Sequence, residues 1–303
     1  MGSKRISLLW SYIAEGPLFR YLLIMPAAAF MALLILYPVL KGIYTSFHYV
    51  NLAQPWRGTP FVGLANYTAL MKDPDFWLSF KNSILYTLGA VASQFLVGFG
   101  AALVLNRHFR GRGVVRGIVL LPWVMPGVLA ALMWSWMYNA QVGVINDILL
   151  RLHLINKPIA WLANPDTAML AVIGVAMWKG FPFFTVMLLA GLQSIPQELY
   201  EAASIDGASA WQRFRYITLP LMKEIILITT TLRIIGAFNY ADLVYVLTEG
   251  GPAKATLTLP VFSFLKAYQY FDFGYSAAIS VIMMLVLFAF TLLYIQLMAV
   301  HKE

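Results

Sequence analysis

Six long apolar segments, separated by shorter polar ones, dominate the hydropathy pattern of this chain. They run from Tyr21 to Tyr44, Ser83 to Leu105, Val115 to Met137, Ala168 to Gly191, Ile225 to Leu247 and Tyr275 to Val300. Each is close to the ~20 residues that an α-helix needs to cross a bilayer core. We therefore predict an all-α integral membrane protein with a cytoplasmic segment over residues 1–20 and a domain of six transmembrane helices over residues 21–300.

The first apolar segment resembles a signal peptide at its start, and later segments contain prolines. Lys4, Arg5 and the alanines at 27–29 imitate a signal peptide, but the first segment continues well past those alanines, which favours an uncleaved span. Pro122, Pro126 and Pro182 interrupt later segments. Prolines in membrane helices usually mark kinks that face other helices or a cavity.

Composition supports the membrane assignment and excludes several chemistries. The chain is 61% hydrophobic and 11% charged, whereas soluble domains carry about 25% charged residues. It has no cysteine, so it has no disulfide, thiol nucleophile or cysteine-ligated metal. The four histidines are scattered and form no ligand set, so we expect no metal site and no enzyme. They are His48, His108, His153 and His301.

The net charge of +8 indicates topology rather than a nucleic-acid partner. With a cytoplasmic N-terminus, most basic residues outside the spans face the cytoplasm, including the dense run NRHFRGRGVVR. The positive-inside rule then predicts a multi-pass protein of the cytoplasmic (inner) membrane with both termini inside. Two outer segments, Asn51–Asp75 and Asn139–Asp166, contain the turn formers Asp73-Pro74 and Asn164-Pro165 and should fold as loops that cover helix ends or contact an external partner.

The polar stretch SIPQELYEAASIDGASAWQRFRYITLP, residues 194–220, lies on the cytoplasmic side in this topology. Ser194 with Gln197 fits a capping box that starts a helix, and Gly207 can end that helix in a left-handed conformation. Ser209 with Gln212 repeats the capping pattern and predicts a second helix toward Ile217. The sequence therefore predicts a helix, a sharp turn and a second helix.

One face of the first predicted helix suits contact with another protein. Tyr200, Ala203, Ser204 and Gly207 share this face, and neighbouring alanines would let a partner approach the backbone closely. The alternative is an amphipathic helix that lies on the membrane surface, which the acidic side chains of Glu201 and Asp206 disfavour at an anionic leaflet. We predict a docking loop.

This loop resembles the signature cytoplasmic loop of permease subunits of bacterial and archaeal ATP-binding-cassette importers, whose pattern is Glu-Ala-Ala, Asp-Gly-Ala and Leu-Pro. The matching residues are Glu201, Ala202, Ala203, Asp206, Gly207, Ala208, Leu219 and Pro220. The resemblance extends over most of the chain and points to the maltose-permease-like side of the carbohydrate branch. The further matching stretches are FVGLANYTAL, LNRHFRGRGVVR, LLPWVMPGVLAALMW, MWKGFPFF, AGLQSIPQELYEAA, FNYADLVYVLTEGGP and FGYSAAIS.

The resemblance implies a binding-protein-dependent importer for a sugar or oligosaccharide, built from a heterodimer of permeases in membrane lipid, two ATPase subunits and an external solute-binding protein. In that family the signature loop seats in a cleft of the ATPase. The chain lacks a G-x-x-x-x-G-K-[ST] phosphate loop. We therefore expect no cofactor on this chain, with ATP and Mg²⁺ bound by the ATPase subunits.

Lys179 and Arg233 fall near the bilayer centre, where a charge costs at least ~2.5 kcal/mol unless it faces a cavity, a counter-ion or a substrate. Two interpretations remain open. In the first, both cations donate hydrogen bonds to a sugar, and Trp123, Phe183 and Tyr240 stack on its rings. In the second, both cations donate to backbone carbonyls that Pro122, Pro126 and Pro182 leave without a helical partner. Buried acids, which an ion-coupled secondary transporter would normally need, are scarce in the spans and disfavour that alternative class.

The resemblance places the sugar-contacting positions of maltose permeases on ten residues of this chain. They are Trp123, Gly127, Ala176, Lys179, Gly180, Phe183, Arg233, Gly236, Ala237 and Tyr240. Ala176, Lys179 and Arg233 replace the polar residues of that family, so maltose itself is not implied. The two cations leave open an anionic or polyol solute, such as a uronide oligosaccharide or a glycerol phosphate ester.

Overall fold

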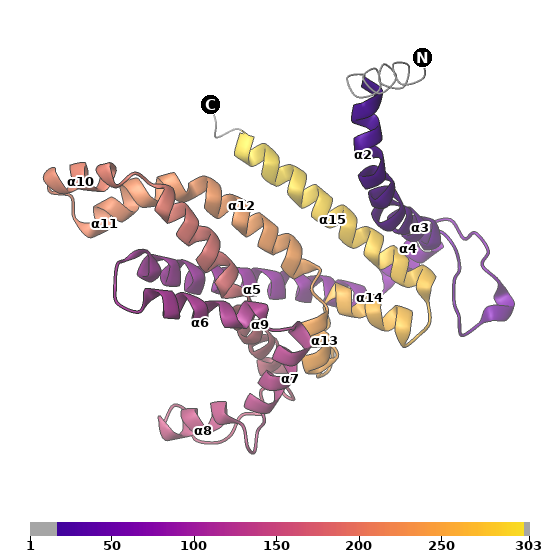
Figure 1. Cartoon of the computed structure of the whole chain (residues 1–303). Coiled ribbons are helices and arrows are strands. Elements are labelled where there is room, and N and C mark those ends of the chain that lie inside the picture. Colours follow the sequence, from indigo (N-terminus) through magenta and orange to yellow (C-terminus); the bar gives the residue numbers. More distant parts are fainter. Residues whose placement is uncertain (1–16, 300–303) are drawn as a thin grey trace, which may run out of the picture.

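Residues 17–299 are described by a computed structural model, and this part of the chain is helical apart from connecting loops and two isolated β-bridges. The elements are α2 (Pro17–Met31), η1 (Ala32–Leu36), α3 (Tyr37–Ser46), η2 (Pro55–Arg57), α4 (Ala65–Lys72), α5 (Pro74–Asn106), α6 (Arg112–Val124), α7 (Gly127–Met137), α8 (Val144–Arg151), α9 (Pro165–Ser194), α10 (Gln197–Ile205), α11 (Ala210–Arg213), η3 (Phe214–Thr218), α12 (Leu219–Phe238), α13 (Asp242–Thr248), α14 (Leu259–Tyr268) and α15 (Phe273–Ala299) (Figure 1). The all-α prediction is confirmed. Of the predicted cytoplasmic segment 1–20, all but residues 17–20 lies outside the described residues.

Four described helices are long and apolar enough to cross a membrane: Tyr21–Ser46, Pro74–Asn106, Pro165–Ser194 and Phe273–Tyr294. α6 and α7 together make a fifth if they form one broken span, with a bend of 97° between them. The predicted segment Ile225–Leu247 is not one helix, because α12 ends at Phe238 and α13 begins at Asp242. The count of six spans stays a prediction.

Two spans begin earlier than the hydropathy pattern predicts, at dipeptides that we assigned to turns. Asp73 caps α5 by accepting a hydrogen bond from the Asp75 amide at 2.9 Å, with Pro74 in the first turn. Asn164 caps α9 in the same way, ahead of Pro165. An acidic or amide cap followed by proline is a helix start because proline's missing N–H costs nothing there.

Of the three prolines that interrupt the later apolar segments, only Pro126 lies at a helix break. Met125 before it is extended, with ψ 131°, and α7 begins after it. Proline disfavours the helical conformation of the residue before it, which accounts for the break. Pro122 and Pro182 lie inside α6 and α9, where the helices continue.

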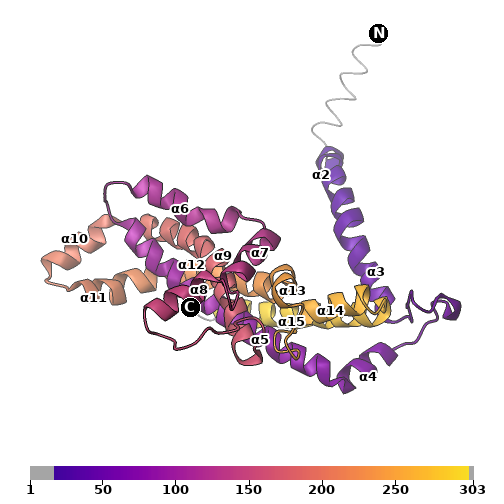
Figure 2. The ribbon, with the colours of Figure 1, turned by 90° about the horizontal axis from the view of Figure 1, so that it is seen from below.

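The centre of the bundle is a pair of long helices, α5 and α9, that pack along each other, with α12 against both and α6 against α9 (Figures 1 and 2). Their buried apolar residues form two clusters. One includes Phe76, Tyr86 and Val172, and the other includes Phe99, Phe184 and Met222. The clusters succeed each other along α5 and α9, and the division falls near the middle of both helices.

The first helix, α2 through α3, stands apart from this bundle and meets it only near its end (Figures 1 and 2). α3 packs against α15. The side chains of residues 21–40 are all exposed in the isolated chain, although most are apolar. In a bilayer this surface would face lipid or another membrane subunit.

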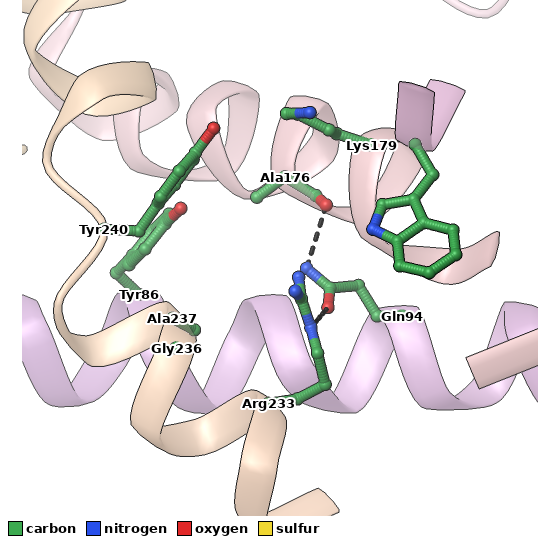
Figure 3. A pocket seen from close by; sticks show the side chains of 9 residues that line it. Tyr86, Gln94, Ala176, Lys179, Arg233, Gly236, Ala237 and Tyr240 are labelled. Carbon is green, nitrogen blue, oxygen red and sulfur yellow. Dashed lines mark hydrogen bonds between the residues drawn. The ribbon is translucent and has the colours of Figure 1, made fainter. Parts of the chain in front are cut away.

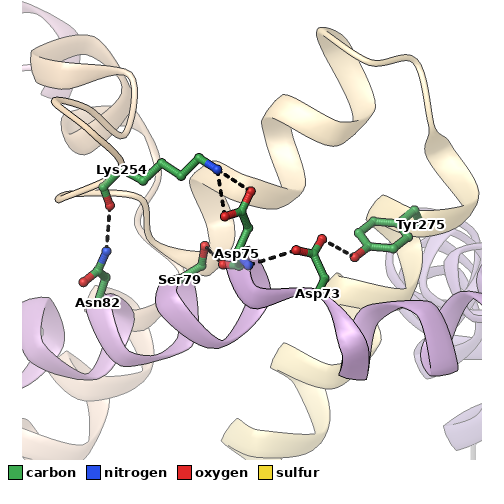
Figure 4. A network of polar contacts seen from close by, with 6 residues as sticks. All are labelled: Asp73, Asp75, Ser79, Asn82, Lys254 and Tyr275. Carbon is green, nitrogen blue, oxygen red and sulfur yellow. Dashed lines mark hydrogen bonds and ion pairs between the residues drawn. The ribbon is translucent and has the colours of Figure 1, made fainter.

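A polar network ties the start of α5 to the loop between α13 and α14 (Figure 4). The Lys254 ammonium donates to both Asp75 carboxylate oxygens, at 2.8 and 2.6 Å, and this hydrogen bond raises the pKa of Lys254. The buried Asn82 amide donates to the carbonyls of Lys254 and Leu257 at 3.0 and 3.1 Å. Tyr275 of α15 donates to Asp73 at 2.7 Å.

We expect Asn82→Ala to destabilise the chain more than Asp75→Asn. The alanine leaves two carbonyls near Asn82 without their donor, a loss that costs about 1–3 kcal/mol in buried positions. The Lys254–Asp75 pair is exposed, and exposed ion pairs contribute little because water and salt screen them. Thermal unfolding of the detergent-purified protein compares the two variants, and an equal or larger loss in Asp75→Asn would contradict this ranking.

Candidate functional site

A cavity of about 310 Å³ lies in the middle of the bundle, between α5, α6, α9 and α12 (Figure 3). It is lined by Tyr86, Gln94, Trp123, Ala176, Lys179, Arg233, Gly236, Ala237 and Tyr240. Tyr86 belongs to the first apolar cluster and Ala237 to the second, so the cavity lies where the two clusters meet. None of these described lining residues is acidic.

Lys179 projects from α9 to the break between α6 and α7. Its ammonium donates to the Met125 carbonyl at 2.7 Å. α7 begins with the hydrogen bond from the Ala130 amide to the Pro126 carbonyl, so the Met125 carbonyl lies outside the α7 ladder. Lys179 thus fits both interpretations left open by the sequence, because it bonds a carbonyl at a proline break and also lines the cavity.

Arg233 on α12 is held by a side chain of α5. Its Nε donates to Gln94 Oε1 at 2.9 Å, and Gln94 Nε2 donates to the Ala176 carbonyl on α9 at 2.8 Å. The guanidinium carbon lies 5.5 Å from the centre of the Phe183 ring. Phe183 in turn meets Trp123 edge to face at 6.1 Å. Arg233 is therefore oriented by a neutral amide and an aromatic ring.

Two glycines allow the side chains around the cavity to approach the helix backbone. A Cβ on Gly180 would collide with the Gln94 amide and with Arg233 Nη2. A Cβ on Gly127 would collide with the Tyr240 hydroxyl. The space around Gly236 is open. The absence of a side chain at Gly180 and Gly127 is thus required by the observed arrangement.

The structure brings together most of the residues predicted for the substrate pathway. Gly127, Gly180 and Phe183 do not line the cavity but touch residues that do, and the other seven line it. Sequence reasoning missed Tyr86 and Gln94, both on α5. Gln94 could have been identified from the sequence, because it is the only amide side chain in the apolar segment Ser83–Leu105. A polar group at that depth of the membrane is costly.

The predicted docking loop forms a helix, a turn and a second helix. α10 ends at Ile205, Gly207 has a φ of 78°, and Ser209 and Gln212 form the predicted capping box. The prediction for Ser194 is wrong: it ends α9 and donates to the Gly191 carbonyl, and the N-cap of α10 is Pro196. Proline cannot continue the α9 ladder, so the new helix starts after it.

The second helix does not stop near Ile217. α11 continues through the π turn η3 into α12, so Leu219 and Pro220 lie in the first turn of α12. Each phi–psi pair at these junctions is helical. The chain from Ala210 to Phe238 is therefore one helical rod that joins the loop to Arg233.

Part of the predicted docking face packs on the chain itself. The Tyr200 hydroxyl lies 2.9 Å from Thr218 Oγ1, and Arg213 Nη1 donates to Ser204 Oγ at 2.7 Å. Ala203 and Ala208 are half-buried, whereas Glu201, Ala202, Asp206 and Gly207 are exposed. The most exposed large apolar side chains of the loop are Ile205, Trp211 and Tyr216, at 87%, 69% and 72% exposure. The surface left for a partner is thus centred on the turn.

Two continuous helices, α9 and α12, connect the loop to the cavity. Lys179 lies 15 residues before Ser194 on α9, about 22 Å at the helical rise. Arg233 lies 14 residues after Leu219 on α12, about 21 Å. Within residues 17–299, no group of three His, Asp or Glu side chains converges as metal ligands would.

The chain matches the family model described as binding-protein-dependent transport system inner membrane component over residues 94–299, which is more than half of its length. The chain belongs to this family. The permease is also 40% identical, over 91% of its length and 92% of the relative's, to the trehalose/maltose transport system permease protein MalF of Thermococcus litoralis. It is 38% identical, over 92% of its length and 90% of the relative's, to the sulfoquinovosyl glycerol transport system permease protein SmoG of Agrobacterium fabrum.

Solved structures agree on the fold. A chain of a bacterial ABC transporter involved in the import of the acidic polysaccharide alginate superposes with a TM-score of 0.80 at 22% identity, covering 95% of the permease and 97% of that chain. The same kind of transporter in complex with an alginate pentasaccharide-bound periplasmic protein gives a TM-score of 0.79 at 22% identity, covering 94% and 95% of the two chains. At this identity the likeness shows the fold alone.

Proposed function

We propose that this permease forms half of the pathway by which an ATP-driven, binding-protein-dependent importer carries a sugar or oligosaccharide across the cytoplasmic membrane. The observation that carries the proposal is the cavity, because aromatic rings and hydrogen-bond donors converge there in the middle of an apolar bundle. Aromatic faces with a few placed polar groups are typical of small-molecule sites. The transport systems named for the relatives support a carbohydrate.

The lining residues take different roles in this proposal. Trp123, Tyr86 and Tyr240 offer apolar faces to the sugar ring, and the tyrosine hydroxyls and the Arg233 guanidinium donate to its oxygens. Lys179 holds the α6–α7 break through Met125 and adds a second charge. A second permease subunit would supply the other half of the pathway.

The loop Ser194–Pro220 is proposed to dock in a cleft of an ATPase subunit on the cytoplasmic side. Its exposed turn and its apolar side chains Ile205 and Trp211 support this, since the described chain leaves them uncovered. In this arrangement both chain termini face the cytoplasm, two ATPase subunits bind ATP and Mg²⁺, and an external solute-binding protein delivers the sugar. α9 and α12 would transmit ATPase closure to the cavity.

The test is uptake by the reconstituted importer. The permease is co-expressed with its second permease, ATPase and binding protein, purified as a complex and placed in proteoliposomes loaded with ATP. We expect accumulation of a labelled sugar that requires ATP and the binding protein. A complex that assembles and hydrolyses ATP but accumulates no member of a panel of neutral, acidic and polyol sugars would refute the proposal.

We expect Lys179→Ala and Arg233→Ala to alter transport without releasing the ATPase, because both cations lie about 20 Å from the docking loop. Removing the Arg233 donor to the substrate, or the Lys179 bond that holds the α6–α7 break, should lower uptake by roughly tenfold. Uptake in proteoliposomes and co-purification of the ATPase give the two readouts. Loss of assembly with unchanged selectivity in the surviving complexes would instead indicate a purely structural role.

A further inference from the structure

Among residues 17–299, no acidic side chain lines the cavity beside its two cations. Lys179 is bonded to a backbone carbonyl and Arg233 to an amide side chain, both neutral groups. Placing two like charges at mid-membrane depth is costly unless an opposite charge joins them. An anionic group on the substrate would supply that charge.

The contact between Gln94 and Arg233 also fixes how the guanidinium is presented. Gln94 is 1% exposed, accepts a hydrogen bond from Arg233 Nε and itself donates to the Ala176 carbonyl. Arginine has five N–H donors. Within residues 17–299, Arg233 makes a side-chain hydrogen bond through Nε and none through Nη1 or Nη2. The terminal fork, which matches the two oxygens of an oxyanion, is left for a ligand in the cavity.

Because the residue that orients Arg233 is a glutamine, the charge of the guanidinium is retained. A glutamate at position 94 would have the same length and could accept the same hydrogen bond, but it would also neutralise Arg233. Glutamine orients the guanidinium and leaves its charge intact. Gly180 provides the space for this pair, since a Cβ there would collide with both side chains.

We propose that Gln94 and Arg233 form an oxyanion subsite and that the permease selects sugars carrying a carboxylate, sulfonate or phosphate group. Arg233 contacts the anionic group through its terminal nitrogens, and Gln94 is the positioning residue that aims them. This inference rests on the proposed transport function. It narrows the substrate class from sugars in general to acidic ones.

The test measures the ratio of anionic to neutral sugar binding by the permease complex in detergent, without the solute-binding protein, whose own selectivity would otherwise dominate. Calorimetric titrations use a uronic-acid disaccharide and the neutral disaccharide of the same linkage, with sulfonated and phosphorylated sugars to identify the group preferred. We expect the wild type to favour an acidic sugar, and Gln94→Glu to lower the ratio by about tenfold or more. Arg233→Gln, which removes the charge, is the second variant should Gln94→Glu fail to assemble.

Gln193→Glu is the matched control. With its amide oriented to accept, Gln193 lies 2.7 and 2.9 Å from Nη2 of Arg112 and Arg116, so it also neighbours guanidinium groups, but it lies outside this cavity. We expect it to leave the binding ratio unchanged. A wild type that binds both disaccharides equally, or a ratio unaffected by Gln94→Glu and Arg233→Gln, would overturn the subsite. A complex that binds and imports no sugar of either kind would instead overturn the transport proposal.

Discussion

Gly207→Pro should abolish sugar import while the ATPase subunits continue to hydrolyse ATP. Gly207 has a φ of 78° and donates its amide to the Ser204 carbonyl at 3.2 Å. Proline is locked near a φ of about −65° and has no N–H, so it can adopt neither feature, and the turn between α10 and α11 must rearrange. Because the exposed surface of the loop is centred on this turn, the partner would lose its docking site. Uptake in proteoliposomes, measured beside ATP hydrolysis, shows whether the two activities separate.

Two further variants separate the shape of the turn from its charge. Gly207→Ala has open space for its Cβ and keeps the N–H, so only the left-handed conformation opposes it, by roughly 1–2 kcal/mol, and its loss of uptake should be partial. Glu201→Lys reverses an exposed charge of the loop and should also uncouple import from hydrolysis. Normal import with an unchanged ATPase response in both Gly207→Pro and Glu201→Lys would eliminate the docking assignment.

The fold could be predicted from the sequence as far as apolar periodicity and local capping determine it. The apolar segments predicted an all-α membrane protein. Gly207 and the Ser209–Gln212 capping pair correctly predicted the turn between α10 and α11. Hydropathy failed at helix starts, because Asp73-Pro74 and Asn164-Pro165 are polar and extend the helices beyond their apolar parts. Capping chemistry, rather than hydropathy, decides those boundaries.

The breaks in the third and fifth predicted spans were harder to predict. Three prolines gave the same local signal, yet only Pro126 lies at a break between helices, while Pro122 and Pro182 are accommodated within helices. The end of α12 at Phe238 has no proline or glycine at Asn239, Tyr240 or Ala241. Asn239 is the C-cap of α12, and Tyr240 after it lines the cavity.

The residues of the candidate site could be predicted where a charged side chain lies within an apolar membrane helix. Lys179 and Arg233 are charges at mid-span, and the resemblance then placed the residues around them. Tyr86 gave no comparable signal, because a tyrosine in an apolar helix usually packs against neighbouring helices. Its position in the cavity depends on the register between α5 and α9, which no local pattern specifies.

The helices that flank the proposed docking loop would connect it to the cavity. α9 carries Lys179 and ends at the loop, and the helical rod from Ala210 carries Arg233 away from it. Gln94 on α5 links the two helices, since it bonds both Arg233 and the Ala176 carbonyl. A relative movement of α9 and α12 would therefore change the Gln94 contacts, which is where we propose substrate binding.

Gly180→Ala should lower sugar uptake by at least about tenfold, because overpacking a tight contact typically costs 1–3 kcal/mol and here displaces functional side chains. The new methyl group would meet the Gln94 amide and Arg233 Nη2, which cannot move away without breaking the hydrogen bonds that hold them. Gly100→Ala on α5 is the control, since its Cβ would meet no atom within 4 Å. Uptake assays on complexes with equal ATPase content measure the effect. Equal uptake by the two variants would mean that the Gln94–Arg233 contact does not govern transport, whereas a loss confined to Gly180→Ala supports a pathway that depends on it.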